Sequence, residues 1–92
     1  MDINDLRRVL DDLDSILIET LARRMSYIPD VAKYKGVHHV ARYQPEREDD
    51  LVNQHREQAA QLGLNPDLAE EVMRTVIKYA HLIEKQELGE EP

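Results

Sequence analysis

Four charged side chains occupy positions where the surrounding pattern predicts another kind of residue. Arg24 stands in the apolar seam of a helix expected over residues 2–35, and Lys35 returns to within about 20° of the same face. Arg47 lies in the first turn of the next expected helix, where the helix dipole disfavours a cation by about 0.3–1 kcal/mol. Glu84 falls on the apolar stripe of the last one. A guanidinium in an apolar seam is costly unless an anion meets it, so these residues predict a site for a small anion.

Three stretches of the chain have the apolar spacing of amphipathic helices. The first is expected over residues 2–35, and Pro29 should disturb it because proline removes a backbone hydrogen bond and clashes with the carbonyl four residues back. A kink at Pro29 is favoured over the alternative, in which the helix ends near Ile28 and a second short helix begins. Gly36 is expected to end the first helix. The second and third are expected over residues 45–62 and 66–88, each with a proline in its first turn. The sequence therefore predicts an all-α fold with three helices per chain.

The apolar residues of the first expected helix follow a seven-residue repeat. One seam holds Ile3, Leu10, Leu17 and Val31, and the other holds Leu6, Leu13, Tyr27 and Tyr34. A chain of 92 residues buries only a modest core, and a helical chain of this length often completes it with a second copy. The seam therefore predicts a homodimer, with or without an enzymatic function.

The composition excludes several classes of protein. With 19 acidic and 12 basic residues the net charge is −7, which argues against nucleic-acid binding. No cysteine is present, so disulfides and thiolate chemistry are excluded. No run resembles a signal peptide or approaches the roughly 20 apolar residues of a membrane span. We expect a soluble, cytoplasmic protein with one domain over residues 1–88 and a disordered tail over 89–92. The histidines lack metal-site spacing and are expected to be solvated.

Several residues recur at the positions of one known family. They are Leu6, Arg7, Val9, Leu13 and Asp14, then Leu21, Ala22 and Arg24, then Lys35, the run Gln44-Pro45-Glu46-Arg47-Glu48, and Glu84. In this pattern the chain resembles, over nearly its whole length, the small all-α class of chorismate mutases. The resemblance implies an intertwined homodimer with two active sites, each completed by both chains. It also implies rearrangement of the dicarboxylate chorismate to prephenate, without cofactor, metal or covalent intermediate.

By this resemblance, two arginines hold the two substrate carboxylates: Arg24 and the partner subunit's Arg7. Lys35 would bond the ether oxygen and a carboxylate. Arg7 precedes Arg24 by 17 residues, which is about 25 Å along a helix. Arg7 therefore cannot reach a small ligand held by Arg24 of its own chain, whereas an antiparallel second chain could bring its own Arg7 there.

The resemblance assigns roles to the remaining candidate residues. Arg47 would be a further cation near the site, and Glu48 would accept a hydrogen bond from the ring hydroxyl. Glu84 would bond the ether oxygen from the side opposite Lys35. Gln44 stands where some members have an acid that contacts the substrate. Because a glutamate donates to an ether oxygen only when protonated, we expect activity to fall as pH rises and Glu84→Gln to flatten that dependence.

Other interpretations of the same residues stay open. Arg23, Arg24, Met25 and Tyr27 also resemble the isochorismate pyruvate lyases, which share the fold and site and form salicylate. A mutase acting on 4-amino-4-deoxychorismate is a second alternative, and a non-catalytic regulatory module that senses chorismate or prephenate is a third. Taken singly, Arg24 could extend to solvent and Lys35 could complement the end of its helix.

Overall fold

The computed structural model describes residues 1–89, which form four α-helices and contain no strand. They are α1 (Ile3–Ser26), α2 (Ile28–Val37), α3 (Pro45–Gln61) and α4 (Pro66–Glu87). Because α1 and α2 are separated only by Tyr27, they form the long, kinked first helix that the sequence predicts, and the all-α fold is confirmed. Residues 90–92, most of the tail expected at 89–92, lie outside the described part of the chain.

The first turn of each helix has backbone N–H groups without a partner in the helix. In this chain a capping side chain accepts from one of them, or a proline removes one. The Asp2 carboxylate accepts a hydrogen bond from the Asp5 backbone N–H at 2.9 Å, and the Asp5 carboxylate accepts from the Asp2 N–H at 3.2 Å, which caps α1. The Asn65 side chain caps α4 by accepting from the Asp67 N–H at 2.9 Å. Within residues 1–89, no helix has both the length and the apolar content needed to cross a membrane. The expected cytoplasmic location stays a prediction.

The kink lies at Tyr27, two residues before the predicted position at Pro29. Pro29 occupies the first turn of α2, where its missing N–H leaves no helical bond unmade. The disruption therefore falls on the preceding turn, where the Tyr27 N–H donates to the Arg24 carbonyl at 3.3 Å. Tyr27 keeps right-handed helical angles, with φ −87° and ψ −15°. The chain changes direction there without a loop.

The predicted stop at Gly36 is wrong, because α2 continues to Val37. The turn is made later by His39, which has a positive φ of 55°. A Cβ atom at position 36 would lie 3.2 Å from Leu88 Cδ2, so the glycine lets the end of α4 approach α2 closely. By contrast Gly63, with φ +75°, ends α3 as predicted.

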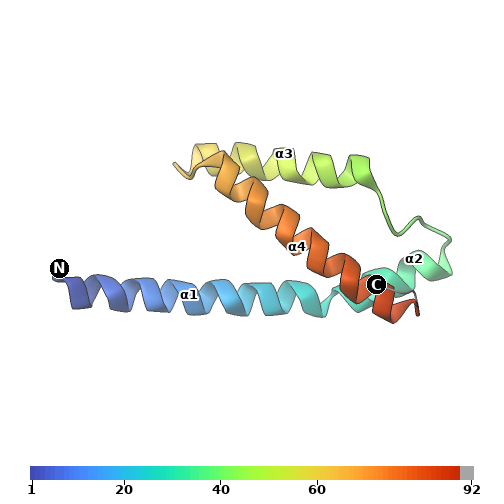
Figure 1. Ribbon diagram of the computed structural model, residues 1–92, viewed down its shortest axis with the longest axis horizontal. Helices are drawn as coiled ribbons and strands as arrows, with labels where there is room; N and C mark the ends of the chain where they lie inside the picture. The colour runs from blue at the N-terminus through green and yellow to red at the C-terminus, as the bar shows by residue number, and fades with distance from the viewer. Residues whose placement is uncertain (90–92) are drawn as a thin grey trace.

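Helix α4 crosses both α2 and α3, whereas α1 extends away from them along a molecule 54 Å long (Figure 1). The small core is made by residues on the three contacting helices: Ile28 and Ala32 on α2, Val52 and Ala59 on α3, and Ala69, Val76 and Ala80 on α4. Helix α1 has no buried residue. Leu10, Leu13 and Leu17 of its predicted seam are 57%, 54% and 54% exposed, so one chain leaves this apolar face uncovered.

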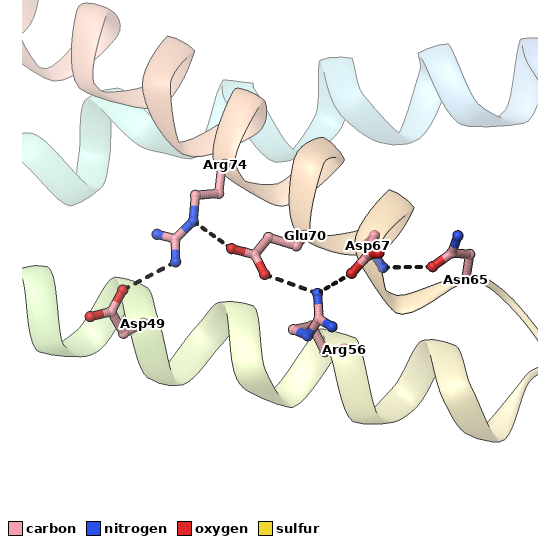
Figure 2. Close-up of polar contacts among 6 residues, drawn as sticks. All are labelled: Asp49, Arg56, Asn65, Asp67, Glu70 and Arg74. Carbon is pink, nitrogen blue, oxygen red and sulfur yellow. Dashed lines mark hydrogen bonds and ion pairs between the residues drawn. The ribbon is translucent and has the colours of Figure 1, made fainter.

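A chain of ion pairs joins α3 to α4 toward their connecting turn (Figure 2). Arg74 bonds Asp49 at 3.2 Å and Glu70 at 3.1 Å, and Arg56 bonds Glu70 and Asp67, both at 3.0 Å. The hydrogen bonds that Arg74 donates to Glu70 and Asp49 raise the pKa of Arg74. Since these groups are partly or well exposed, each pair stabilises the fold by only about 0–1 kcal/mol.

Candidate functional site

A cavity of about 320 Å³ lies where all four helices and the loop over residues 38–44 meet. Its volume is within the range of about 300–1,000 Å³ found for small-ligand sites. Six of the seven predicted site residues line it: Arg24, Lys35, Gln44, Arg47, Glu48 and Glu84. The rest of its wall is formed by Arg42, His81 and apolar side chains, among them Ile28, Leu51 and Ile77. The structure thus brings together residues up to 60 positions apart in the sequence.

Arg24 reaches the cavity from the last turn of α1. Its Nη1 atom is buried, and among the side chains of residues 1–89 it is the only buried nitrogen or oxygen with no hydrogen-bond partner. A buried donor without a partner costs about 1–3 kcal/mol, and more when it is charged. The sequence predicts that Arg24 lies in an apolar seam and needs an anion as its partner. In the structure Arg24 lines the cavity and has a buried donor without a partner, which agrees with that prediction.

Lys35 and Glu84 form a partly buried ion pair across the cavity. Lys35 Nζ lies 3.2 Å and 3.4 Å from the two Glu84 carboxylate oxygens, and it donates a further bond to the Arg42 carbonyl at 3.0 Å. The Glu84 side chain is 6% exposed and that of Lys35 18%. A buried ion pair of this kind is a weak source of stability, because desolvation offsets the attraction. Its position at a cavity wall is better explained by ligand binding.

Lys35 and Glu84 contact each other directly, which the sequence does not predict. The resemblance places Lys35 and Glu84 on opposite sides of a substrate oxygen, whereas here they bond each other directly. A ligand oxygen that takes hydrogen bonds from both must therefore enter between them and replace their mutual contact.

His81 and Arg42 are two polar cavity residues that the sequence reasoning missed, and His81 makes contacts with both Arg42 and Glu48. His81 was expected to be solvated, but its side chain is only 22% exposed and it lines the cavity. Its Nε2 lies 2.9 Å from Glu48 Oε2, and its Nδ1 lies 2.7 Å from Arg42 Nη1. One signal could have found it: His81 precedes Glu84 by three residues, and this spacing places the two on neighbouring positions of one helix face.

The remaining predicted residues that line the cavity are Arg47, Gln44 and Glu48. Arg47 is exposed in the first turn of α3, as the sequence predicts. The Gln44 side-chain amide donates to the Ala41 carbonyl at 3.1 Å, which holds it within the loop. Glu48 is 20% exposed and turned to His81.

The cavity has the opposite charge to the molecule. Four basic side chains line it, Arg24, Lys35, Arg42 and Arg47, against two carboxylates, so its formal charge is +2. The whole chain has a net charge of −7. Over residues 1–89, no group of three or more histidine or carboxylate side chains is placed to hold a metal ion. A local excess of guanidinium and ammonium groups suits a small dianion.

A family model described as chorismate mutase type II matches residues 6–85, which is most of the chain and includes every residue of the cavity. The chain belongs to the chorismate mutase type II family. This confirms the resemblance drawn from the cation spacing, the run over residues 44–48 and the acid on the last helix.

Two curated relatives show the extent of the similarity. The T-protein of Enterobacter agglomerans is 32% identical over 83 residues, an alignment that covers 90% of this chain and 22% of that protein. The T-protein of Haemophilus influenzae is 34% identical over 84 residues, covering 91% of this chain and 22% of the relative. The chain therefore spans about a fifth of the length of these relatives.

Arg7 is the predicted residue that this chorismate mutase type II chain does not bring to its own cavity. It is exposed near the start of α1, whereas Arg24 lies near the end of the same straight helix (Figure 1). Their separation of 17 residues amounts to about 25 Å. Within one chain, then, the cavity lacks one of the two arginines that the family resemblance assigns to it.

Proposed function

We propose that this chain is a chorismate mutase that converts chorismate to prephenate in the cavity between its helices. The observation that carries the proposal is that Arg24, whose Nη1 atom is buried without a partner, lines a cavity with a formal charge of +2. Chorismate is a dicarboxylate, so its charge complements that of the cavity. Family membership over residues 6–85 supports the same reaction.

The proposed chemistry needs no nucleophile and no proton-transfer intermediate. In the rearrangement the ether C–O bond breaks while a C–C bond forms, and negative charge develops on the ether oxygen. Lys35 is suited to stabilise that charge, because its Nζ is already held by the Arg42 carbonyl at 3.0 Å. Arg24 would hold a carboxylate, and the cavity would keep the substrate in its compact, reactive conformation. Glu84 would donate to the ether oxygen in its protonated form.

A homodimer is part of the proposal. The support is that α1 has no buried residue and that its apolar side chains at positions 3, 6, 10, 13 and 17 are all 44–57% exposed. Burying this face against a second copy would contribute about 25 cal/mol for each Å² of apolar surface removed from water. In an antiparallel arrangement, the partner subunit's Arg7 would complete the cation set around Arg24.

Two parallel assays on the purified protein test the reaction, at pH 5 and pH 7.5. The first follows the loss of chorismate absorbance, with acid conversion of prephenate to phenylpyruvate; the second follows salicylate fluorescence from isochorismate. Prephenate as the dominant product is the expected result. Salicylate as the dominant product would instead identify an isochorismate pyruvate lyase, and silence in both assays would reject the mutase.

A further inference from the structure

We propose that His81 is a positioning residue that orients the Glu48 carboxylate in the substrate cavity, acting as the neutral ring with its hydrogen on Nε2. This inference rests on the proposed function, in which Glu48 accepts a hydrogen bond from the substrate's ring hydroxyl. The contacts that carry it are those of the two ring nitrogens, one to Arg42 and one to Glu48.

The partners of the ring fix its tautomer. A guanidinium group only donates hydrogen bonds, so Arg42 Nη1, 2.7 Å away, donates to Nδ1 of His81. Nδ1 must then accept with its lone pair, and the ring hydrogen resides on Nε2. From there it is donated to Glu48 Oε2 at 2.9 Å. A doubly protonated ring would lose the bond from Arg42 and would set two cations against each other.

Packing also holds the His81 ring in place. Tyr43 packs edge-on against His81, with ring centroids 5.8 Å apart and an interplanar angle of 72°. The His81 and Glu48 side chains are 22% and 20% exposed, so water competes only partly for their hydrogen bond. The imidazole can therefore define a position for the carboxylate, which an exposed glutamate with three rotatable bonds would not have by itself.

These bonds close a continuous chain between the two carboxylates of the cavity. Glu84 bonds Lys35, Lys35 donates to the Arg42 carbonyl, the Arg42 guanidinium donates to His81, and His81 donates to Glu48. The loop over residues 38–44 is thus fixed at Arg42 through both its backbone and its side chain. The chain couples the position of the acid at the ether oxygen to that of the acid at the ring hydroxyl.

The consequence for the substrate lies in binding rather than in the chemical step. His81 occupies Oε2 of Glu48 and leaves Oε1 to accept from the ring hydroxyl. Because that hydroxyl contact is made equally in the ground state and the transition state, loosening Glu48 raises KM more than it lowers kcat. A charge-assisted hydrogen bond of this kind corresponds to about tenfold in affinity.

Three substitutions separate the two contacts of the ring. In His81→Gln the side-chain amide nitrogen can replace Nε2 as the donor to Glu48. In His81→Asn the amide oxygen can replace Nδ1 as the acceptor from Arg42, but no donor reaches Glu48. His81→Leu removes both contacts. Lys78→Gln, an exposed position one turn earlier on α4 and outside the cavity, is the matched control.

We expect KM for chorismate to rise about tenfold in His81→Asn and His81→Leu, while kcat changes less than about threefold. In His81→Gln and Lys78→Gln, KM should stay within about twofold of the wild-type value. In a Glu48→Gln background, His81→Leu should add less than about twofold, because both substitutions act through one contact. Equal KM values in all variants, or independent effects of His81→Leu and Glu48→Gln, would overturn the proposal.

A measurement that does not depend on activity separates this proposal from the proposed function. Long-range ¹⁵N–¹H NMR of the wild-type protein at pH 8.5 reads the tautomer of each histidine ring, and His81→Gln identifies the signals of His81. The expected result is a hydrogen on Nε2 and none on Nδ1. A hydrogen on Nδ1 would overturn the positioning role, whereas a wild-type protein with the expected tautomer and no mutase activity would reject the proposed function instead.

Discussion

Replacing Arg24 with methionine should separate ligand binding from folding, because the atom that we propose to bind an anion is unsatisfied in the folded protein and therefore destabilises it. Its Nη1 is buried without a partner among the side chains that the structure describes. Methionine keeps a long, flexible side chain suited to an apolar seam. Removing a buried, unsatisfied donor raises the free energy of unfolding by about 1–3 kcal/mol. Part of this gain is offset because the packing contacts of the arginine side chain are lost. The free energy of unfolding should therefore rise by about 1 kcal/mol, or about 4–8 °C in Tm for a domain of this size.

The same substitution should remove most of the activity. Truncating one partner of a buried charge pair costs about 3–5 kcal/mol, which lowers kcat/KM by roughly a thousandfold. Thermal unfolding at a fixed protein concentration and the prephenate assay measure the two effects on one preparation. Arg23→Met is the control, because Arg23 is exposed on the preceding position of α1 and does not line the cavity. Its stability should stay within about 0.5 kcal/mol of the wild type. An Arg24→Met protein that is both less stable and inactive would show that Arg24 is structural, and one that keeps its activity would refute its role in binding.

Three further outcomes are expected. Glu84→Gln should keep mutase activity, since a side-chain amide can donate to the ether oxygen, whereas Glu84→Leu should lose it because leucine donates no hydrogen bond; prephenate formation by Glu84→Leu at the wild-type rate would contradict this. Gly36→Ala should raise the free energy of unfolding by about 0.5 kcal/mol, because alanine has a higher helix propensity than glycine. This gain should exceed the cost of moving the flexible end of Leu88, which would lie 3.2 Å from the new Cβ atom. A lower Tm would show that Leu88 cannot move. Arg56→Met should lower the free energy of unfolding by about 0.5–1 kcal/mol in dilute buffer and by less in 1 M salt, since exposed ion pairs are screened; urea unfolding at both salt concentrations measures the difference.

Local chemistry explains why most of the fold could be predicted. Apolar spacing, the Asp2 and Asn65 caps and the prolines at 45 and 66 act within a few residues, so they locate the helices from the sequence alone. Gly36 was predicted to end a helix because glycine usually does. Its actual role depends on Leu88 at the far end of the chain, which no local pattern reveals.

In the candidate site, too, some residues could be predicted from local patterns and others could not. Arg24, Arg47 and Glu84 could be found because each contradicts its own local pattern, and the structure places all three at one cavity. The direct contact of Lys35 with Glu84 and the two bonds of His81 join segments 33–49 residues apart, so they depend on how the helices cross. His81 contradicts no local pattern. Its one signal in the sequence is its position three residues before Glu84, and its contacts form only when α3 and the loop over residues 38–44 pack against it.

We propose that each active site contains Arg24 of one chain and the partner subunit's Arg7. Subunit mixing tests it most directly: Arg7→Met and Arg24→Met chains, each inactive as a homodimer, are co-expressed with different tags and the mixed dimers are isolated by both. Each mixed dimer would contain one site with both arginines and one site with neither, so about half of the wild-type rate of prephenate formation should return. Mixed dimers as inactive as either parent, or a wild-type protein that sediments as a monomer, would contradict the shared site.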